Sequence, residues 1–393
     1  MSAPAKDQDA AVGGTAWLEL DQINERLGLG VDRVMGEAGL WAPELAARAL
    51  RQAHGDPPEA AQLLRAHRTA LPRLAIGEPV STTELKVVRR ISSAFRNPPG
   101  GQVLGRTLDY VGRLLDLMPE DEGRARNAGS PGPGHTRPHD DEHDDEHDDE
   151  HDDEHGHVHD HGHVHGHDHH HGHVHRHRGP DHDAPEEAVR TPAHVLATFR
   201  DMGLVAPPRG EGDPEPFDIT RRPARPGAPR SAWLQTMARA DTGSLLYLWY
   251  GSDWRPAGHE VPGELRHGIL PLRVRHPHTG RPVTVAETRV SEVQTFHSLP
   301  RAGELPTSLD VGYGLCFGHN ERKAISMAGL DLLLAHHEGA TDLQHDVLLT
   351  LDGPDSTGYT QHLKLPHHVE YRSVLERAHA AARGTRLTER DTA

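Results

Sequence analysis

A histidine- and acid-rich tract between His139 and Arg178 constrains this chain most, because it cannot form part of a packed core. Four tandem Asp-Asp-Glu-His units fill residues 140–155, and an alternation of His with Gly, Val or Asp follows to His177. Almost every residue there is charged, polar or glycine, so no apolar face exists whose burial could offset the entropy of ordering. We therefore predict that residues 119–190 form a disordered insert.

The same tract accounts for most of the acidity of the chain, whose 393 residues carry a formal net charge of −17. Residues 139–178 hold 14 acidic side chains against Arg176 and Arg178, a local charge of −12, so the remainder carries only −5. The global charge therefore argues neither for nor against a nucleic-acid partner. We expect no such partner.

Cysteine usage and hydropathy limit the compartment and the chemistry. The one cysteine, Cys316, excludes a disulfide framework within the chain, and one thiol cannot hold an iron–sulfur cluster by itself. No apolar run reaches membrane-spanning length, and no basic-then-apolar leader follows Met1. We expect a cytoplasmic protein that does not contact a membrane.

The histidines of the tract could bind metal ions. Of the 35 histidines in the chain, 17 lie between His139 and His177, a density able to bind Zn, Ni, Co or Cu through interchangeable imidazole sets. One interpretation is metal buffering or delivery, and the other is a tolerated insertion whose metal affinity is incidental. Composition alone leaves both open.

Helical signals dominate the chain before the tract. Pro43 and Pro58 each stand at the start of an apolar-periodic run, where a missing amide proton costs least. Ser81-Thr-Thr-Glu84 has the pattern of a capping box and predicts a further helix over residues 85–95. We predict a helical N-terminal region over residues 1–118, with another helix between Leu108 and Leu115.

After the tract, the spacing of apolar residues alternates between helical and strand periods. Residues 191–384 are predicted to complete an α+β fold, with antiparallel strands from Ile269 onward around a turn at 276–280 and a mobile tail at 385–393. The other expected elements are helices before Gly203, after an N-cap at Ser231, from about Asn320 and over 369–383, a buried strand at 312–318, and a short strand at 346–351.

Gly318-His-Asn-Glu-Arg-Lys323 is a candidate phosphate site, because Arg322 and Lys323 fall in the first turn of a predicted helix. Cations are mildly unfavourable at that end of the helix dipole, and a bound anion would relieve this. The alternative is that both side chains extend into water.

His362 and His367 are a candidate metal pair, but their spacing of five residues brings them together only if the chain turns near Pro366. Two imidazoles are an incomplete ligand set for zinc, so further ligands would come from elsewhere. The alternative is two ordinary histidines on either side of a turn. Glu260 and Glu264 lie in a charged segment that we expect to be a loop, and Arg89-Arg90 is interpreted as a solvated helix face, with phosphate contact as the alternative.

Longer strings on both sides of the tract match a known family. They are Val88-Arg-Arg-Ile-Ser, Pro99-Gly-Gly-Gln-Val-Leu-Gly, Asp241-Thr-Gly-Ser-Leu, Gly312-Tyr-Gly-Leu-Cys-Phe-Gly, Glu321-Arg-Lys-Ala-Ile-Ser-Met-Ala and His362-Leu-Lys-Leu-Pro-His. The chain resembles subunit I of the bacterial carbon–phosphorus lyase core complex over about residues 31–118 and 191–377. The histidine tract is not a feature of that family, and the segment 352–357 departs from its pattern.

The resemblance implies a nucleosidase-like enzyme that displaces adenine from ATP by methylphosphonate, giving ribose 1-methylphosphonate 5-triphosphate. It implies subunits G, H and J and the ATPase-like subunits K and L as partners, in a hetero-oligomer with two copies of this chain. It also implies that His362 and His367 bind zinc near subunit J.

The displacement develops positive charge on the ribose, so a carboxylate is needed there and cations at the triphosphate. Glu321, Glu264 and Glu260 are the candidate carboxylates, and Arg322 and Lys323 the candidate triphosphate contacts. Two other functions fit the sequence. One is a metal-handling protein working through the tract, and the other is a stand-alone nucleosidase that releases the base from a nucleoside triphosphate to water.

Overall fold

The computed structural model describes residues 17–105, 115, 117–123, 192–205, 216–251, 262–298, 308–336, 341–351 and 367–390. The chain divides into a unit made of residues 1–115 with 189–393, and a second unit, 116–188. In the second unit, Gly123 N donates to Pro119 O at 2.9 Å and closes one helical turn. The predicted insert otherwise lies outside the described residues, as does nearly all of the helix expected over 108–115.

Four helices open the first unit, namely α1 (Leu20–Arg26), α2 (Gly28–Ala38), α3 (Pro43–Gln52) and α4 (Pro57–Thr69). Prolines occupy the first positions of α3 and α4, as the sequence predicted, because those positions have no helical partner for an amide proton. Small and branched side chains at helical spacing form their shared core, which includes Ile23, Val34, Met35, Ala46 and Leu64.

The second layer is a four-stranded antiparallel sheet in the order β1-β2-β3-β4. Its strands are β1 (Lys86–Ser92), β2 (Pro262–Arg275), β3 (Pro282–His297) and β4 (Asp310–Phe317). The turn between β2 and β3 is closed by His276 N donating to Arg281 O at 2.9 Å, which confirms the predicted hairpin.

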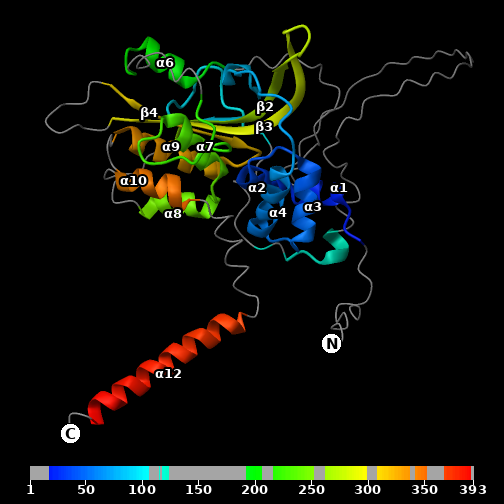
Figure 1. The fold of residues 1–393 in the computed structure, drawn as a ribbon. Helices are drawn as coiled ribbons and strands as arrows, with labels where there is room; N and C mark the ends of the chain where they lie inside the picture. Colours follow the sequence, from blue (N-terminus) through cyan, green and yellow to red (C-terminus); the bar gives the residue numbers. More distant parts are fainter. Residues whose placement is uncertain are drawn as a thin grey trace, which may run out of the picture. The chain divides into compact units, whose positions relative to one another are not determined.

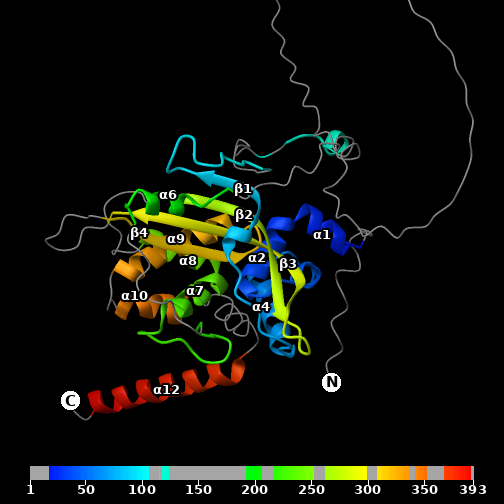
Figure 2. The same cartoon turned by 90° about the horizontal axis from the view of Figure 1, so that it is seen from above.

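Helices cover both faces of this sheet (Figures 1 and 2). One face carries α9 (Glu321–His336), with α7 (Arg230–Arg239) and α8 (Thr242–Gly251) around it, and the other face carries α6 (Val195–Asp201). The contact of α9 with β4 is close because Gly312 and Gly314 face the carbonyl oxygens of Ala328 and Ala324, where a Cβ would clash. Only glycine at these positions lets the backbones approach so closely.

Further elements toward the end of the chain are α10 (Thr341–His345), the π-helical turn η3 (Asp346–Thr350) and α12 (His368–Arg390). The strand predicted at 346–351 is therefore wrong. Val347, Leu348 and Leu351 are buried at helical spacing, and this packing overrides their strand propensity. Helix α12 also continues past Gly384, where it was expected to stop, since one glycine costs a helix only about 1 kcal/mol.

The prediction of a helix after Ser81 is also wrong. Thr82–Glu84 forms a single 3-10 turn (η2), with Ser81 Oγ accepting from Thr83 N at 3.3 Å, and strand β1 follows. The β-branched residues of β1 pair with β2, and this long-range pairing outweighs a local cap. Helix α7 likewise begins after Pro229, while Ser231 Oγ accepts from Phe217 N at 3.0 Å.

The fold class is α+β, with a helical N-terminal region and an antiparallel sheet assembled from both sides of the insert. Strand β1 comes from the N-terminal part of the chain and pairs with β2 from the C-terminal part. Within the part of the chain that the structure describes, no helix has both the length and the apolarity needed to span a bilayer.

Candidate active site

Two consecutive arginines on β1 organise the polar chemistry of the sheet. Arg89 and Arg90 are both almost fully buried, and each pairs with a carboxylate on a different face. The expectation of a solvated helix face was wrong because these residues belong to a strand, where neighbouring side chains point to opposite sides. One face meets α9 and the other meets the segment leading into α6.

The first pair, Arg90 with Glu264 of β2, is sealed. Arg90 Nε lies 2.7 Å from Glu264 Oε1, and the two side chains are 0% and 1% exposed. Arg90 also donates to the carbonyl oxygens of Pro99 and Gly101 at 2.7 and 2.8 Å and to that of Ala193 at 3.2 Å. The sealed pair therefore fixes the chain before and after the predicted insert to the same point of the sheet.

Both oxygens of Glu264 are occupied. Oε2 accepts from Val195 N at 3.0 Å and lies 3.3 Å from Nδ1 of His194. Burial alone would raise the pKa of Glu264, but the hydrogen bonds from His194, Arg90 and Val195 outweigh it and hold this pKa below its ordinary value. Glu264 was expected in a loop, but it lies inside β2, where it is buried with a partner on each oxygen.

The second pair, Arg89 with Glu321, is open. Glu321 is the first residue of α9, and its Oε1 receives Arg89 Nε at 2.7 Å and lies 3.1 Å from His319 Nε2. No hydrogen bond to Oε2 is found among the described residues, and the side chain is 15% exposed. Burial would raise the pKa of Glu321, but His319 and Arg89 more than offset it and lower this pKa, so the group is ionised.

A stacked pair of imidazoles lies beside Glu321. The ring of His319 lies on that of His267 with centroids 4.4 Å apart and planes 17° apart. His267 lies on β2, where Nδ1 is 3.3 Å from Ser291 Oγ. Burial, with the nearby charges of His319 and Arg289, lowers the pKa of His267 to about 4, so this ring is neutral at physiological pH.

Helix α2 completes the cluster through Asp32. Its carboxylate accepts from His319 N at 3.0 Å and pairs with Arg289 of β3 at 3.1 Å, while burial raises its pKa. Gly318 precedes His319 with φ of 76°, and a Cβ there would lie 2.6 Å from that of Asp32. Glycine is required at 318 both for this left-handed conformation and for the contact.

We call this group the α9 cluster. Its members are Asp32, Arg89, His267, Arg289, His319 and Glu321.

The predicted cations near the start of α9 do not lie together. Lys323 is 1% exposed, and its Nζ donates to Ala240 O at 2.7 Å, while burial lowers its pKa to about 8. Arg322 is exposed. The anion-binding hypothesis therefore keeps only Arg322 as an accessible cation from this string.

Sequence reasoning missed Asp32, Arg89, His267, Arg289 and His319 as members of one site. The only available signal was the string around Gly318, in which His319 stands two residues before Glu321. The other members come from α2, β1, β2 and β3, and no local pattern connects them.

The predicted metal ligands are described only in part. His367 lies just before α12, with Nδ1 3.7 Å from Glu370 Oε2 and a side chain that is 28% exposed. His362 and the candidate carboxylate Glu260 lie outside the described residues. Among the described residues, no group of three or more His, Cys, Asp or Glu side chains could hold a metal ion.

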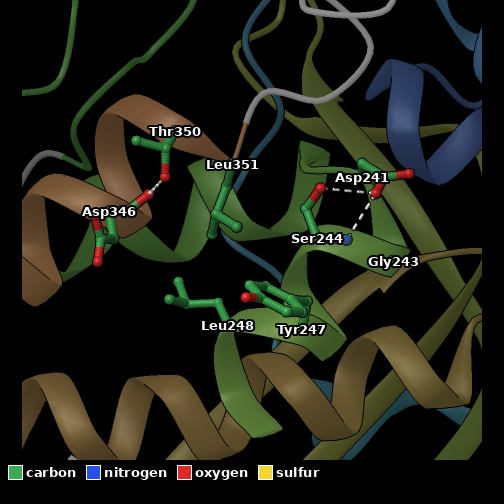
Figure 3. Close-up of a pocket in the computed structure, with 8 residues that line it drawn as sticks. All are labelled: Asp241, Gly243, Ser244, Tyr247, Leu248, Asp346, Thr350 and Leu351. Atoms are coloured by element: carbon green, nitrogen blue, oxygen red, sulfur yellow. Dashed lines mark hydrogen bonds between the residues drawn. The ribbon is translucent and has the colours of Figure 1, made fainter. Parts of the chain in front are cut away.

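A hollow of about 540 Å³ lies between α8 and η3 (Figure 3). Asp241 at its rim accepts from Ser244 N and Oγ at 2.7 and 2.9 Å and so caps the start of α8. Its other oxygen lies 3.3 Å from Arg33 Nη2. Because Asp241 is already used to join α8 to α2, the hollow offers less chemistry than the α9 cluster.

Comparisons with known proteins cover most of the chain. The profile of a family described as bacterial phosphonate metabolism protein (PhnI) matches residues 4–385. A Stutzerimonas stutzeri protein named putative C-P lyase subunit protein HtxH is 37% identical over 92% of this chain and 86% of its own length. Proteins named alpha-D-ribose 1-methylphosphonate 5-triphosphate synthase subunit PhnI are 35% identical in Rhizobium meliloti (strain 1021) and 33% in Escherichia coli (strain K12). Each alignment covers 91% of this chain, and 85% and 88% of those proteins respectively.

Proposed function

Because the chain belongs to the PhnI family of bacterial phosphonate metabolism proteins, as a subunit of a carbon–phosphorus lyase system, we propose that it displaces adenine from ATP by methylphosphonate. The product would be ribose 1-methylphosphonate 5-triphosphate, the compound in the printed names of two relatives. Those names also describe subunits, which supports action with partners, proposed to be subunits G, H, J, K and L and a second copy of this chain.

The reaction places specific demands on the site. A phosphonate oxygen forms a bond to C1′ of the ribose while the bond from C1′ to N9 of adenine breaks, and positive charge develops on the sugar. A fixed carboxylate beside C1′ stabilises that charge without having to reorganise.

The observation that carries the proposal is that Glu321 Oε2 has no hydrogen-bond partner within the part of the chain that the structure describes. Glu321 is ionised, and Arg89 and His319 hold one of its oxygens, which leaves the other available to a ribose cation. Glu264 offers no free oxygen, so we assign it a structural role and retain Glu260 as the alternative carboxylate. Arg322 remains the proposed triphosphate contact, whereas the Lys323 ammonium is engaged by Ala240 O in the core.

Adenine release by the assembled complex tests this function. With ATP and methylphosphonate, Glu321→Gln should lower the rate by about 10²–10³-fold, the usual effect of removing one electrostatic contact to a transition state. Glu287→Gln is the matched control, because Glu287 is an exposed carboxylate paired with Lys86 at 2.8 Å. Equal rates for Glu321→Gln and wild type would rule out Glu321. Adenine release by the purified chain without partners or phosphonate would instead support the stand-alone nucleosidase.

Zinc is proposed at His362 and His367. The partly exposed imidazole of His367 and the neighbouring carboxylate of Glu370 are donors that suit zinc, and both lie at the start of a helix where a further ligand could approach. Zinc, when bound, would supply a Lewis acid and a link between subunits. The double variant His362→Ala/His367→Ala should lose zinc from the purified complex and growth on methylphosphonate. Full zinc content and full growth would contradict the assignment.

The histidine tract supports a second candidate, metal buffering or delivery, since 17 imidazoles lie between His139 and His177. Deleting residues 135–183 separates the possibilities. Growth on phosphonate that is lost only when zinc is limiting would support delivery. Unchanged growth in both conditions would support a neutral insert.

A further inference from the structure

We propose that His319 is the general acid that protonates the leaving adenine, an assignment that rests on the proposed function of the α9 cluster. Its side chain is 24% exposed and lies beside the candidate carboxylate, with Nε2 3.1 Å from Glu321 Oε1. No hydrogen bond to Nδ1 is found within the described part of the chain. One ring nitrogen is therefore engaged in the site and the other is available to a ligand.

Three contacts hold the imidazole in one orientation. Its ring lies on His267 at 4.4 Å, its Nε2 meets Glu321, and its backbone N–H donates to Asp32 at 3.0 Å. Asn320 N also donates to Ser291 Oγ at 3.0 Å, which fixes the next residue of the turn. A group that must deliver a proton along one direction gains from such pre-organisation.

The stacking partner does not compete for this role. His267 is 6% exposed and neutral at physiological pH, because burial and the charges of His319 and Arg289 lower its pKa to about 4. It has no proton to give under those conditions. We therefore assign His267 as a positioning residue, whose ring packs against the ring of His319.

Charged groups of both signs face His319. Glu321 on α9 and Asp32 on α2 are acidic neighbours, Arg89 on β1 and Arg289 on β3 are basic ones, and His267 on β2 is neutral. The direct contact is with the Glu321 carboxylate. The same carboxylate can thus stabilise both the protonated acid and the ribose cation.

A phosphonate oxygen donates an electron pair to C1′, and the electron pair of the bond from C1′ to N9 leaves with the base. His319 Nδ1 transfers its proton to N7, so that adenine departs as a neutral molecule. Solvent then returns a proton to the imidazole.

A substrate that needs no acid separates catalysis from structure. In 7-methyl-ATP the purine already carries a positive charge, so the base can leave without a proton at N7. For the assembled complex, His319→Gln should slow base release from ATP by about 10²–10³-fold, but that from 7-methyl-ATP by less than about fivefold, as expected for lost general acid catalysis. Glutamine can still hydrogen-bond to Glu321, and an unchanged melting temperature would show that the fold is intact.

Two further measurements complete the test. With ATP, the rate of the wild-type complex should fall as rising pH deprotonates the acid, and this limb should be absent with 7-methyl-ATP. His278→Ala is the matched control, because His278 is an exposed histidine in the turn between β2 and β3, and it should behave as wild type with both nucleotides. Base released without enzyme is subtracted for each nucleotide.

The outcomes distinguish the two levels of the proposal. If wild type releases base from ATP and His319→Gln loses the same factor with both nucleotides, the assignment of His319 is overturned and the proposed function stands. If wild type releases base from neither nucleotide, the proposed function fails and the assignment falls with it. Selective loss with ATP supports both.

Discussion

The sealed pair Arg90–Glu264 and the open pair Arg89–Glu321 have the same chemistry and adjacent arginines, but they serve different ends. In both, an arginine Nε lies 2.7 Å from a carboxylate oxygen. Glu264 is 1% exposed with both oxygens engaged, whereas Glu321 is 15% exposed and one of its oxygens has no hydrogen-bond partner among the described residues. Ion-pair geometry therefore says little about role, and access to the carboxylate decides it.

The energetic consequences differ as well. A buried ion pair gains little net stability over an apolar contact, because desolvation offsets the attraction, but removing one partner leaves a buried charge uncompensated. The fold should therefore not tolerate the loss of either partner of the sealed pair. The open pair can exchange a protein contact for water or substrate.

Truncation of the sealed pair should have the largest effect. Arg90→Ala leaves Glu264 buried and releases the carbonyl groups of Pro99 and Ala193, so we expect it to lower the free energy of unfolding by about 3–5 kcal/mol. Urea denaturation followed by circular dichroism measures this. Lys86→Ala is the control, since its pair with Glu287 is exposed and should contribute less than about 1 kcal/mol. Similar losses for the two variants would show that burial of the Arg90–Glu264 pair does not increase the cost of losing one partner.

The loss of stability in acid should come from His267, which lies in the α9 cluster with the open pair. The pKa of His267 is lowered from 6.5 to about 4, so the unfolded chain binds more protons between these values. The contribution is fully present above the unfolded pKa and is lost as pH falls toward the folded one, by about 3 kcal/mol in total. Unfolding free energies between pH 7.5 and 4 should show this slope in wild type, and His267→Asn should flatten it. An unchanged slope in the variant would contradict a buried neutral His267.

Removing the open carboxylate should cost little stability. We expect Glu321→Gln to lower the free energy of unfolding by about 1 kcal/mol, because the glutamine oxygen can still accept a hydrogen bond from Arg89, which also keeps its bond to Leu104 O at 2.6 Å. Since the folded pKa of Glu321 lies below its ordinary value of 4.5, this difference should be present above that pH and shrink as pH falls through the folded pKa. A loss as large as that of Arg90→Ala would show that the open pair is also structural.

Shortening the insert should have the smallest effect. Arg90 of the sealed pair holds the chain at Gly101 and at Ala193. The positions of these two residues therefore do not depend on the length of the segment between them. If the insert is disordered, as the sequence predicts, deleting residues 124–188 should raise stability by only about 1 kcal/mol, because each halving of a flexible loop contributes about 0.6 kcal/mol. A thermal melt compares the two chains. Marked destabilisation would mean that the insert packs on the fold.

Features decided by neighbouring residues could be predicted from the sequence, whereas features decided by residues far apart in the chain could not. Pro43 correctly marked the start of a helix, and the turn before Arg281 marked a hairpin, because both are decided by neighbours in the chain. The capping box at Ser81 was misleading, since the segment after it gains more by pairing with β2. Of the candidate site residues, Glu321 was named as a carboxylate for the reaction that the family resemblance implies, whereas its partner Arg89, 232 positions away, was not connected with it.

The α+β class and the helical start of the chain could be predicted from the sequence, because periodicity is a local property. Composition, which is also local, predicts that the histidine tract does not pack. The sequence also placed Glu321 at the beginning of a helix. Three features became visible only in the folded chain: Arg89 and Arg90 point to opposite faces, one pair is sealed and the other open, and His319 stacks on His267 beside Glu321. Burial and orientation depend on which distant elements cover each face of the sheet, and no stretch of sequence contains that information.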